Sequence, residues 1–196
     1  MDEKTLKPRI RFKGFTEVWE QRNITETSSV SIGLVTTMTS HYCNEGTLLI
    51  RNSDIRDNVF DFSDEPIYLD LEFANKNRNR MHQIGDVITV HTGDVGSSAV
   101  ISSKEDKSIG FATIITRPNQ KILNSNYLSC YLNTDKHKKF AVSISTGDGR
   151  TNYNLGDYIQ LEIPLPDLEE QEKISQFIIK LNSLITLHQR KQVLIY

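Results

Sequence analysis

The stretch that decides the organisation of this chain is Ile163-Pro164-Leu165-Pro166-Asp167-Leu168-Glu169-Glu170-Gln171-Glu172-Lys173-Ile174. Its two prolines force an extended backbone, because proline disfavours the helical conformation in the residue before it. Asp167, followed three residues later by Glu170, is typical of a capping box at the start of a helix. Since neither Gly nor Pro follows before Tyr196, we predict one continuous helix. We expect a globular domain over residues 1–165 and a long helix over residues 166–196.

Apolar side chains in this predicted helix recur at spacings of three and four, which places them along one face. About 29 helical residues would reach roughly 43 Å at about 1.5 Å each. That length exceeds what the domain needs for its own core, so we predict coiled-coil association with another helix, of this chain or another. The alternative is an ordinary core helix. The residues expected on the associating face are Ile174, Phe177, Ile178, Leu181, Leu184, Ile185, His188, Gln192 and Ile195.

The body before the helix consists mainly of short β-rich runs separated by turn residues, which predicts an α+β fold with a curved, mixed sheet and short packed helices. We expect strands near residues 47–50, 66–69, 86–90, 99–101 and 110–115, and a last strand within 155–163. We expect helices over residues 17–23 after a Thr16 cap, over 125–132 with Ser125 as cap, and from a Thr134 cap to about residue 144.

The composition is that of a folded protein without a membrane segment. The chain has 196 residues, of which 37% are hydrophobic and 24% charged, and it contains no apolar run of about 18 residues. We therefore expect a soluble, cytoplasmic protein. Cys43 and Cys130 stand far apart and the five histidines are scattered, so we predict neither a metal site nor a disulfide.

The net charge of −2 does not indicate a nucleic-acid binder, since such domains are often strongly basic. Positive charge is nevertheless concentrated in the runs 76–80 (KNRNR) and 136–139 (KHKK), while acidic residues gather elsewhere. Any affinity for DNA must come from such local clusters. The alternative is that each run is simply a solvated surface.

Several stretches, in this order, resemble the specificity subunits of bacterial type I restriction-modification systems. They are residues 8–22 (PRIRFKGFTEVWEQR), 49–55 (LIRNSDI), 84–88 (IGDVI), 92–96 (TGDVG), the opening stretch 163–174 and residues 187–191 (LHQRK). Together they extend along the whole chain. The resemblance implies a DNA target-recognition domain followed by a spacer helix. Family members usually carry two of each, so this chain looks like a natural half subunit, a truncated product or a fragment.

The resemblance also implies the partners. A specificity subunit recognises part of a split site in double-stranded DNA and docks the methyltransferase (modification) subunits and, through the complex, the restriction/translocase subunit. Two copies joined through their helices would form a homodimer that reads a palindromic split site. A regulatory or assembly protein that binds partner subunits without reading DNA remains an alternative.

Catalytic chemistry is then expected in other subunits, and we predict no catalytic residue and no cofactor. The sequence has no glycine-rich cofactor loop after a strand, no Walker loop and no Asn/Asp-Pro-Pro-aromatic tetrapeptide. Asp94 with Glu105-Asp106-Lys107 loosely fits the D…ExK pattern of magnesium-dependent nucleases. Because we expect residues 105–107 to form an exposed hairpin tip, a nuclease is the weakest alternative.

DNA recognition needs cations to neutralise phosphates, and amide or guanidinium groups to read base edges. Such side chains gather in the expected loops, around the glycine turns and in the basic run. The candidate DNA-binding residues are Arg51, Asn52, Lys76, Asn77, Arg78, Asn79, Arg80, His91, Thr92, Ser97, Arg150, Thr151, Asn152 and Tyr153.

Overall fold

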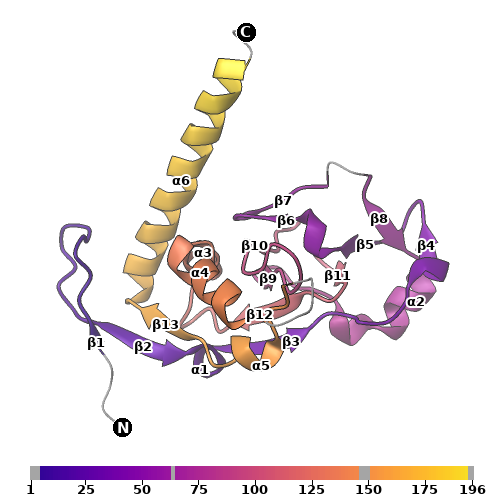
Figure 1. Ribbon diagram of the computed structural model, residues 1–196, viewed down its shortest axis with the longest axis horizontal. Coiled ribbons are helices and arrows are strands. Elements are labelled where there is room, and N and C mark those ends of the chain that lie inside the picture. The colour runs from indigo at the N-terminus through magenta and orange to yellow at the C-terminus, as the bar shows by residue number, and fades with distance from the viewer. Residues whose placement is uncertain (1–4, 63–64, 146–150, 194–196) are drawn as a thin grey trace.

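The computed structural model describes residues 5–62, 65–145 and 151–193, and it shows a β-rich body from which one long helix projects (Figure 1). The strands are β1 (Thr5–Leu6), β2 (Trp19–Asn23), β3 (Ser28–Ile32), β4 (Tyr42–Cys43), β5 (Thr47–Ile50), β6 (Ile55–Arg56), β7 (Val59–Phe60), β8 (Ile67–Leu69), β9 (Val87–Thr89), β10 (Ser98–Val100), β11 (Ile109–Gly110), β12 (Ile114–Pro118) and β13 (Glu162–Leu165). The helices are α1 (Ile24–Thr27), α2 (Leu71–Lys76), α3 (Ser125–Leu132), α4 (Asp135–Ile144), α5 (Leu155–Tyr158) and α6 (Leu168–Val193), with 3-10 turns η1 (Thr39–His41), η2 (Asn52–Asp54) and η3 (Arg78–Arg80).

The strands form several small sheets. The central sheet has the order β10-β9-β12-β3 and is antiparallel throughout. A second sheet, β11-β5-β8-β4, is mixed, because β11 runs parallel to β5. Strand β2 lies between β1 and β13 in a third sheet, next to the start of α6. The predicted α+β class with a mixed sheet and a long C-terminal helix is confirmed.

Both faces of the central sheet are covered, because successive residues of a strand point to opposite sides. Val87 joins a core that includes Leu128 of α3 and Tyr158 of α5. Its neighbour Ile88 packs on the other face, in a cluster with Ile50 of β5. The segment 86–90 (DVITV), in which every residue is buried, is therefore part of a strand that is covered on both sides.

The helix predicted over residues 17–23 is wrong, since Trp19–Asn23 forms β2. The pairing of β2 with both β1 and β13 overrides the helix-forming side chains of this segment. A short helix starts only after Asn23, whose side chain accepts a hydrogen bond from the Thr25 backbone.

The bounds of several other elements also differ from those predicted. The strand predicted over 110–115 is split into β11 and β12 at Ala112, whose φ of 50° is left-handed. Residues 155–163 begin as helix α5 and only then enter β13. Thr134 caps α4 as predicted, whereas the cap of α3 is Asn124 rather than Ser125.

The start of α6 is where the helix is fastened to the body. The backbone N–H of Glu170 donates to Asp167 Oδ1 at 2.8 Å, as a capping box predicts. The Glu170 carboxylate, however, turns inward and accepts from Arg11 Nε (2.9 Å), Arg11 Nη2 (2.6 Å) and Trp19 Nε1 (2.8 Å). Glu170 is fully buried. We call Arg11, Trp19 and Glu170 the Glu170 clamp.

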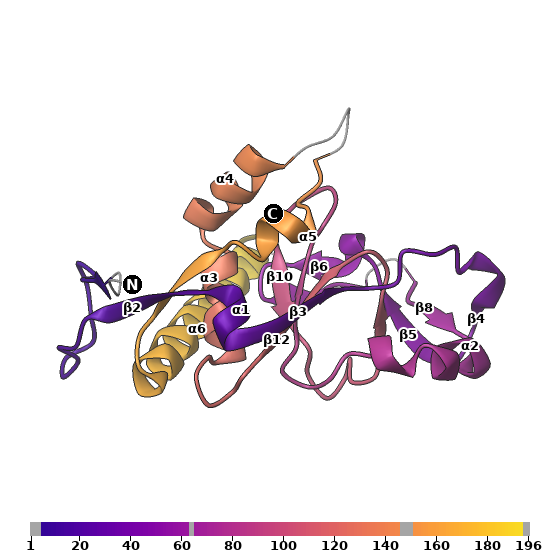
Figure 2. The ribbon, with the colours of Figure 1, turned by 90° about the horizontal axis from the view of Figure 1, so that it is seen from below.

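Beyond the clamp, α6 leaves the body. Gln171, also fully buried, accepts from the Asn124 backbone at 2.8 Å and donates to Ile122 O at 3.0 Å. The helix packs on α3 and then extends away from it (Figures 1 and 2). Within the described ranges, no helix is long and apolar enough to cross a membrane.

Two buried histidines predict a pH-dependent stability. Burial lowers the pKa of His82 and of His137 from 6.5 to about 4. The unfolded chain takes up these protons near pH 6.5 and the folded chain only near pH 4, so the free energy of unfolding falls as the pH drops through this window. We expect up to about 1.4 kcal/mol per pH unit for each histidine. Urea unfolding at pH 7, 6 and 5 measures the slope, which should be shallower in His137→Gln than in the wild type.

The Glu170 clamp predicts that replacing Glu170 destabilises the fold much more than replacing a nearby carboxylate of the same helix. Glu170→Ala removes the acceptor of three hydrogen bonds, and we expect the free energy of unfolding to fall by about 1.5–3 kcal/mol, typical of hydrogen bonds to a charged group. Glu172→Ala is the matched control, because Glu172 is exposed and its carboxylate accepts only from Gln176 in the described part of the chain. Thermal and urea unfolding measure both, and equal losses would contradict a specific role for Glu170.

Candidate nucleic-acid interface

Three chain segments that the sequence proposed for DNA contact meet at one end of the central sheet. Thr92 pairs with Asn152 in an isolated antiparallel bridge, and Thr92 Oγ1 donates to Asn152 Oδ1 at 2.9 Å. The His91 backbone donates to Asn52 Oδ1 at 2.9 Å, and Gly93 donates to Thr151 O at 3.2 Å. We call Asn52, His91, Thr92, Thr151 and Asn152 the loop-end cluster.

The side chains of this cluster are partly exposed and partly used to hold it together. The Asn52 amide also donates to Ala112 O at 3.3 Å, so both of its ends serve the fold. Burial lowers the pKa of His91, whose ring lies against the Thr92 hydroxyl at 2.8 Å. Asn152 differs, because only its oxygen has a partner among the described residues. Its amide nitrogen is therefore left as a donor, on a side chain that the Thr92 hydroxyl holds through the oxygen.

Two of the proposed residues lie too deep for direct contact. Tyr153 is fully buried, its hydroxyl 3.3 Å from His137 Nε2 and its ring edge-on to Tyr158. Ser97 is fully buried as well. Because both residues are buried, we do not include Tyr153 and Ser97 among the proposed DNA contacts. Their side chains instead stabilise the loops that carry the other candidates.

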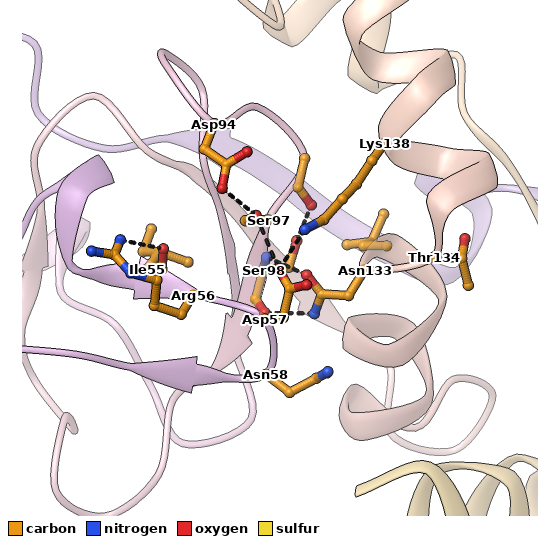
Figure 3. Close-up of polar contacts among 12 residues, drawn as sticks. Ile55, Arg56, Asp57, Asn58, Asp94, Ser97, Ser98, Asn133, Thr134 and Lys138 are labelled. Carbon is orange, nitrogen blue, oxygen red and sulfur yellow. Dashed lines mark hydrogen bonds and ion pairs between the residues drawn. The ribbon is translucent and has the colours of Figure 1, made fainter. Parts of the chain in front are cut away.

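Ser97 belongs to a polar network beside the glycine loop, in which Gly93 and Gly96 have φ of 99° and 89°. Its hydroxyl lies 3.1 Å from Asp57 Oδ1 and 3.3 Å from Asp94 Oδ2. Figure 3 shows Lys138 reaching Asp57 from α4, at 2.5 Å. This lysine, part of the basic run 136–139, thus neutralises an acid instead of standing alone on the surface. The network ties the glycine loop, the β6–β7 turn and α4 together.

The basic run 76–80 lies in a different place, at the end of α2 and in η3. Lys76 pairs with Glu72 at 2.7 Å, and the Asn77 amide donates to Phe73 O at 2.9 Å. Arg80 Nη1 donates to Ile32 O at 2.8 Å, which anchors η3 over β3. Arg78 and Asn79 are exposed, and neither side chain has a hydrogen-bond partner in the ranges the structure describes.

The Arg51 side chain forms an ion pair within the protein. Its Nε and Nη2 donate to the two oxygens of Asp54 at 3.0 and 2.6 Å, and Asp54 is buried. This ion pair closes η2 at the end of β5. Arg150 lies outside the described residues.

The residues of the nuclease-like pattern do not form an exposed tip, which corrects that expectation for Glu105. Glu105 is buried, and its carboxylate accepts from the Ser102 backbone at 3.1 Å and hydroxyl at 2.6 Å. It therefore closes a turn. Across residues 5–62, 65–145 and 151–193, no three His, Cys, Asp or Glu side chains are grouped to hold a metal ion.

The outward face of α6 is apolar. Ile174 and Ile178 are half-buried, and Phe177 makes an edge contact with Phe12 at 5.9 Å between ring centroids. Further along, Leu181, Leu184 and Ile185 are 44%, 55% and 47% exposed. The predicted face is therefore solvent-accessible over its outer half in this single chain. His188 is exposed, while the Gln192 side chain and Ile195 lie outside the described residues.

Sequence reasoning missed Arg117. It stands on β12 and donates from Nε and Nη2 to the buried carboxylate of Asp86 at 2.7 and 2.8 Å. The hydrogen bond to Asp86 raises the pKa of Arg117. Because the two residues are 31 positions apart and neither lies in a charged run, no local pattern pointed to them.

Comparison with known proteins places the fold in a family. Residues 15–195 match the family described as the type I restriction modification DNA specificity domain, so the chain belongs to this family.

Individual relatives are more distant. The chain is 27% identical over 133 residues to the type I restriction enzyme EcoBI specificity subunit of Escherichia coli, an alignment that covers 66% of this chain and 27% of that protein. It is 28% identical over 117 residues to the putative type I restriction enzyme MjaX specificity subunit of Methanocaldococcus jannaschii, covering 57% of this chain and 28% of the relative. The alignments thus span about a quarter of the length of these curated relatives.

Solved structures show the same fold at lower identity. The HsdS subunit of Thermoanaerobacter tengcongensis superposes with a TM-score of 0.65 at 20% identity, covering 96% of this chain and 42% of that one. The type I restriction-modification S subunit of M. genitalium superposes with a TM-score of 0.61 at 14% identity, covering 94% of this chain and 46% of that one. The described fold is therefore that of less than half of each solved chain.

The Thr92–Asn152 pair predicts a base-reading amide. If Asn152 donates to a base edge, Asn152→Ala should weaken binding to a duplex carrying the recognised sequence by about 1–3 kcal/mol, and leave a random duplex unaffected. Thr92→Val removes only the orienting hydroxyl and should give a smaller loss of the same kind. Fluorescence anisotropy with both duplexes measures the two variants, and parallel losses on cognate and random DNA would contradict base reading.

Proposed function

We propose that this chain is a sequence-specific DNA-binding unit that recognises one part of a split target in double-stranded DNA. It also holds that reading surface against the methyltransferase subunits, and through them the restriction subunit, of a type I restriction-modification complex. The single observation that carries the proposal is the separation of two surfaces on one rigid body. The loop-end cluster offers oriented amide and hydroxyl groups, and α6 offers an apolar face.

The exposed half of α6 supports a docking role. Leu184 and Ile185 are 55% and 47% exposed, although burying a leucine or isoleucine side chain is worth about 1.5–3 kcal/mol. A partner helix that covers this face would recover that energy, as in a two-stranded coiled coil. The partner is either a second copy, in which case two reading surfaces face a palindromic split site, or another subunit of the complex.

The catalytic steps belong, in this proposal, to the partner subunits, and the chain itself needs no cofactor. The Glu105 carboxylate, which the nuclease alternative requires for a metal ion, is committed to Ser102. We place the protein in the cytoplasm, together with the DNA that it reads.

Co-expression of the chain with a methyltransferase subunit tests the function. We expect sequencing of the genomic DNA to reveal methylation in a motif of two parts separated by unread bases. A palindromic motif indicates two copies of this chain in the complex, and an asymmetric motif indicates another reading partner. Assembly with the methyltransferase without any sequence preference would overturn DNA reading and favour a regulatory protein.

The docking role has its own variants. Leu184→Glu places a charge on the apolar face, and we expect at least a tenfold loss of complex formation, because the leucine burial is lost. Ser183→Glu is the matched control, since Ser183 is exposed on the opposite side of α6. Size-exclusion chromatography with light scattering measures both. Equal behaviour of the two variants would contradict docking through this face.

A further inference from the structure

A small hollow on the central sheet gathers hydrogen-bond donors that the proposed reading surface does not use. It has a volume of about 50 Å³, and its polar lining consists of Ser29, Ser31, Asn79, Arg80 and Arg117. We call it the arginine hollow. It lies away from the loop-end cluster, because β9 and β12 run antiparallel and Arg117 stands near the start of β9, whereas His91 follows its end.

The floor of the hollow is set by strand register. Strands β3 and β12 lie side by side (Figure 2), with Ser29 opposite Arg117 and Ser31 opposite Ile115. Directly paired residues point to the same face of a sheet, and residues two apart along a strand do so as well. The two serine hydroxyls and the Arg117 guanidinium are therefore presented together. Both serines are exposed, and neither hydroxyl has a hydrogen-bond partner in the described part of the chain.

The two guanidinium groups are held in place by the protein. Arg80 enters from η3, where its Nη1 is bound to Ile32 O at 2.8 Å, and its Nε and Nη2 have no partner among the described residues. Arg117 is held by the buried carboxylate of Asp86 through Nε and Nη2, which leaves Nη1 without a partner in the same ranges. Because the two side chains are already anchored, less side-chain conformational entropy is lost when a ligand binds their remaining N–H groups.

The chemistry of the lining selects the ligand. Guanidinium, hydroxyl and amide groups line the hollow, and the carboxylate of Asp86 is not among the lining residues. The glycine loop differs, since it contains Asp94 and lies against Asp57 of the β6–β7 turn. Donors from two arginines suit a tetrahedral oxyanion, which arginine binds through charge-assisted hydrogen bonds. The hollow, with a volume of about 50 Å³, admits a group of this size.

We propose that the arginine hollow binds a backbone phosphate of the DNA, as a contact that positions the protein on the duplex without reading sequence. This inference rests on the proposed function. Arg78, exposed on the same 3-10 turn as Arg80, extends the positive charge beyond the hollow, which favours a polyanion over an isolated phosphate ion. The contact would complement the base-reading amides at the other end of the sheet.

The test uses variants that leave the Asp86–Arg117 pair intact. Arg80→Gln removes one guanidinium from the exposed turn, and Ser31→Asp places a carboxylate on the floor of the hollow. Each variant should lower the affinity for a duplex that carries the recognised motif and for a scrambled duplex by the same factor, about fivefold at 0.15 M salt. Each should also reduce the slope of log K against log salt by about 0.9. Lys121→Gln, an equal loss of charge at an exposed position outside the hollow, should leave affinity and slope unchanged.

A second measurement separates the hollow from the proposed function. Titration of the chain with inorganic phosphate, against chloride at equal ionic strength, should shift the backbone amide NMR signals of Ser29, Ser31 and Arg80 in the wild type and not in Ser31→Asp. Phosphate shifts combined with unaltered DNA affinity in both variants would overturn the assignment to DNA and leave a free oxyanion as ligand. Absence of shifts together with unaltered DNA affinity would overturn the site altogether. A wild type that binds all duplexes equally would overturn sequence reading, and a common loss in both variants would still support the hollow.

Discussion

The buried carboxylate of Glu170 is the interaction on which the arrangement of this protein depends. It sits in the first turn of α6 and accepts from Arg11 and Trp19, two residues more than 150 positions earlier in the chain. A buried charge without such donors would cost several kcal/mol, so the N-terminal segment and the helix must fold together. Because the same turn is bound to the body through Gln171, the direction of the helix is set at its base. In the proposed function, a partner that binds the outer half of α6 therefore holds the loop-end cluster at a defined angle.

The two ends of the central sheet have different chemistry. At one end, backbone and amide groups from three segments hold each other. Of the two acids nearby, Asp57 pairs with Lys138, and Asp94 accepts from the Ser97 hydroxyl. At the other end, the arginine hollow offers cationic donors. Base edges are read by oriented donors and acceptors, whereas phosphates are bound by positive charge. In the proposed function, this separation divides specificity from affinity within one domain. The sheet that joins the ends is buried on both faces, which keeps their distance constant.

The features that were predictable from the sequence are those with local causes. Asp167 and Glu170 marked the start of α6, and Thr134 marked that of α4, because caps act within one turn. The strand at 19–23 was mistaken for a helix, since its state is decided by pairing with β13, about 140 residues later. The meeting of Asn52, Thr92 and Asn152 follows from tertiary contacts, although their residue types were recognised. Tyr153 was assigned to the surface because an aromatic residue after a glycine turn carries no sign of the buried His137 and Tyr158 beside it.

The arginines show most clearly why a count of charges misleads. Arg11, Arg51 and Arg117 each bind a buried carboxylate, those of Glu170, Asp54 and Asp86 respectively. Their charge therefore stabilises the fold, and of the Arg117 guanidinium only Nη1 remains for a ligand. Arg78 and Arg80, by contrast, face solvent on η3. A chain with a net charge of −2 gains little non-specific affinity for DNA from its overall charge. In the proposed function, recognition therefore depends on oriented donors and on partners bound through α6, which add binding energy by fixing several contacts at once.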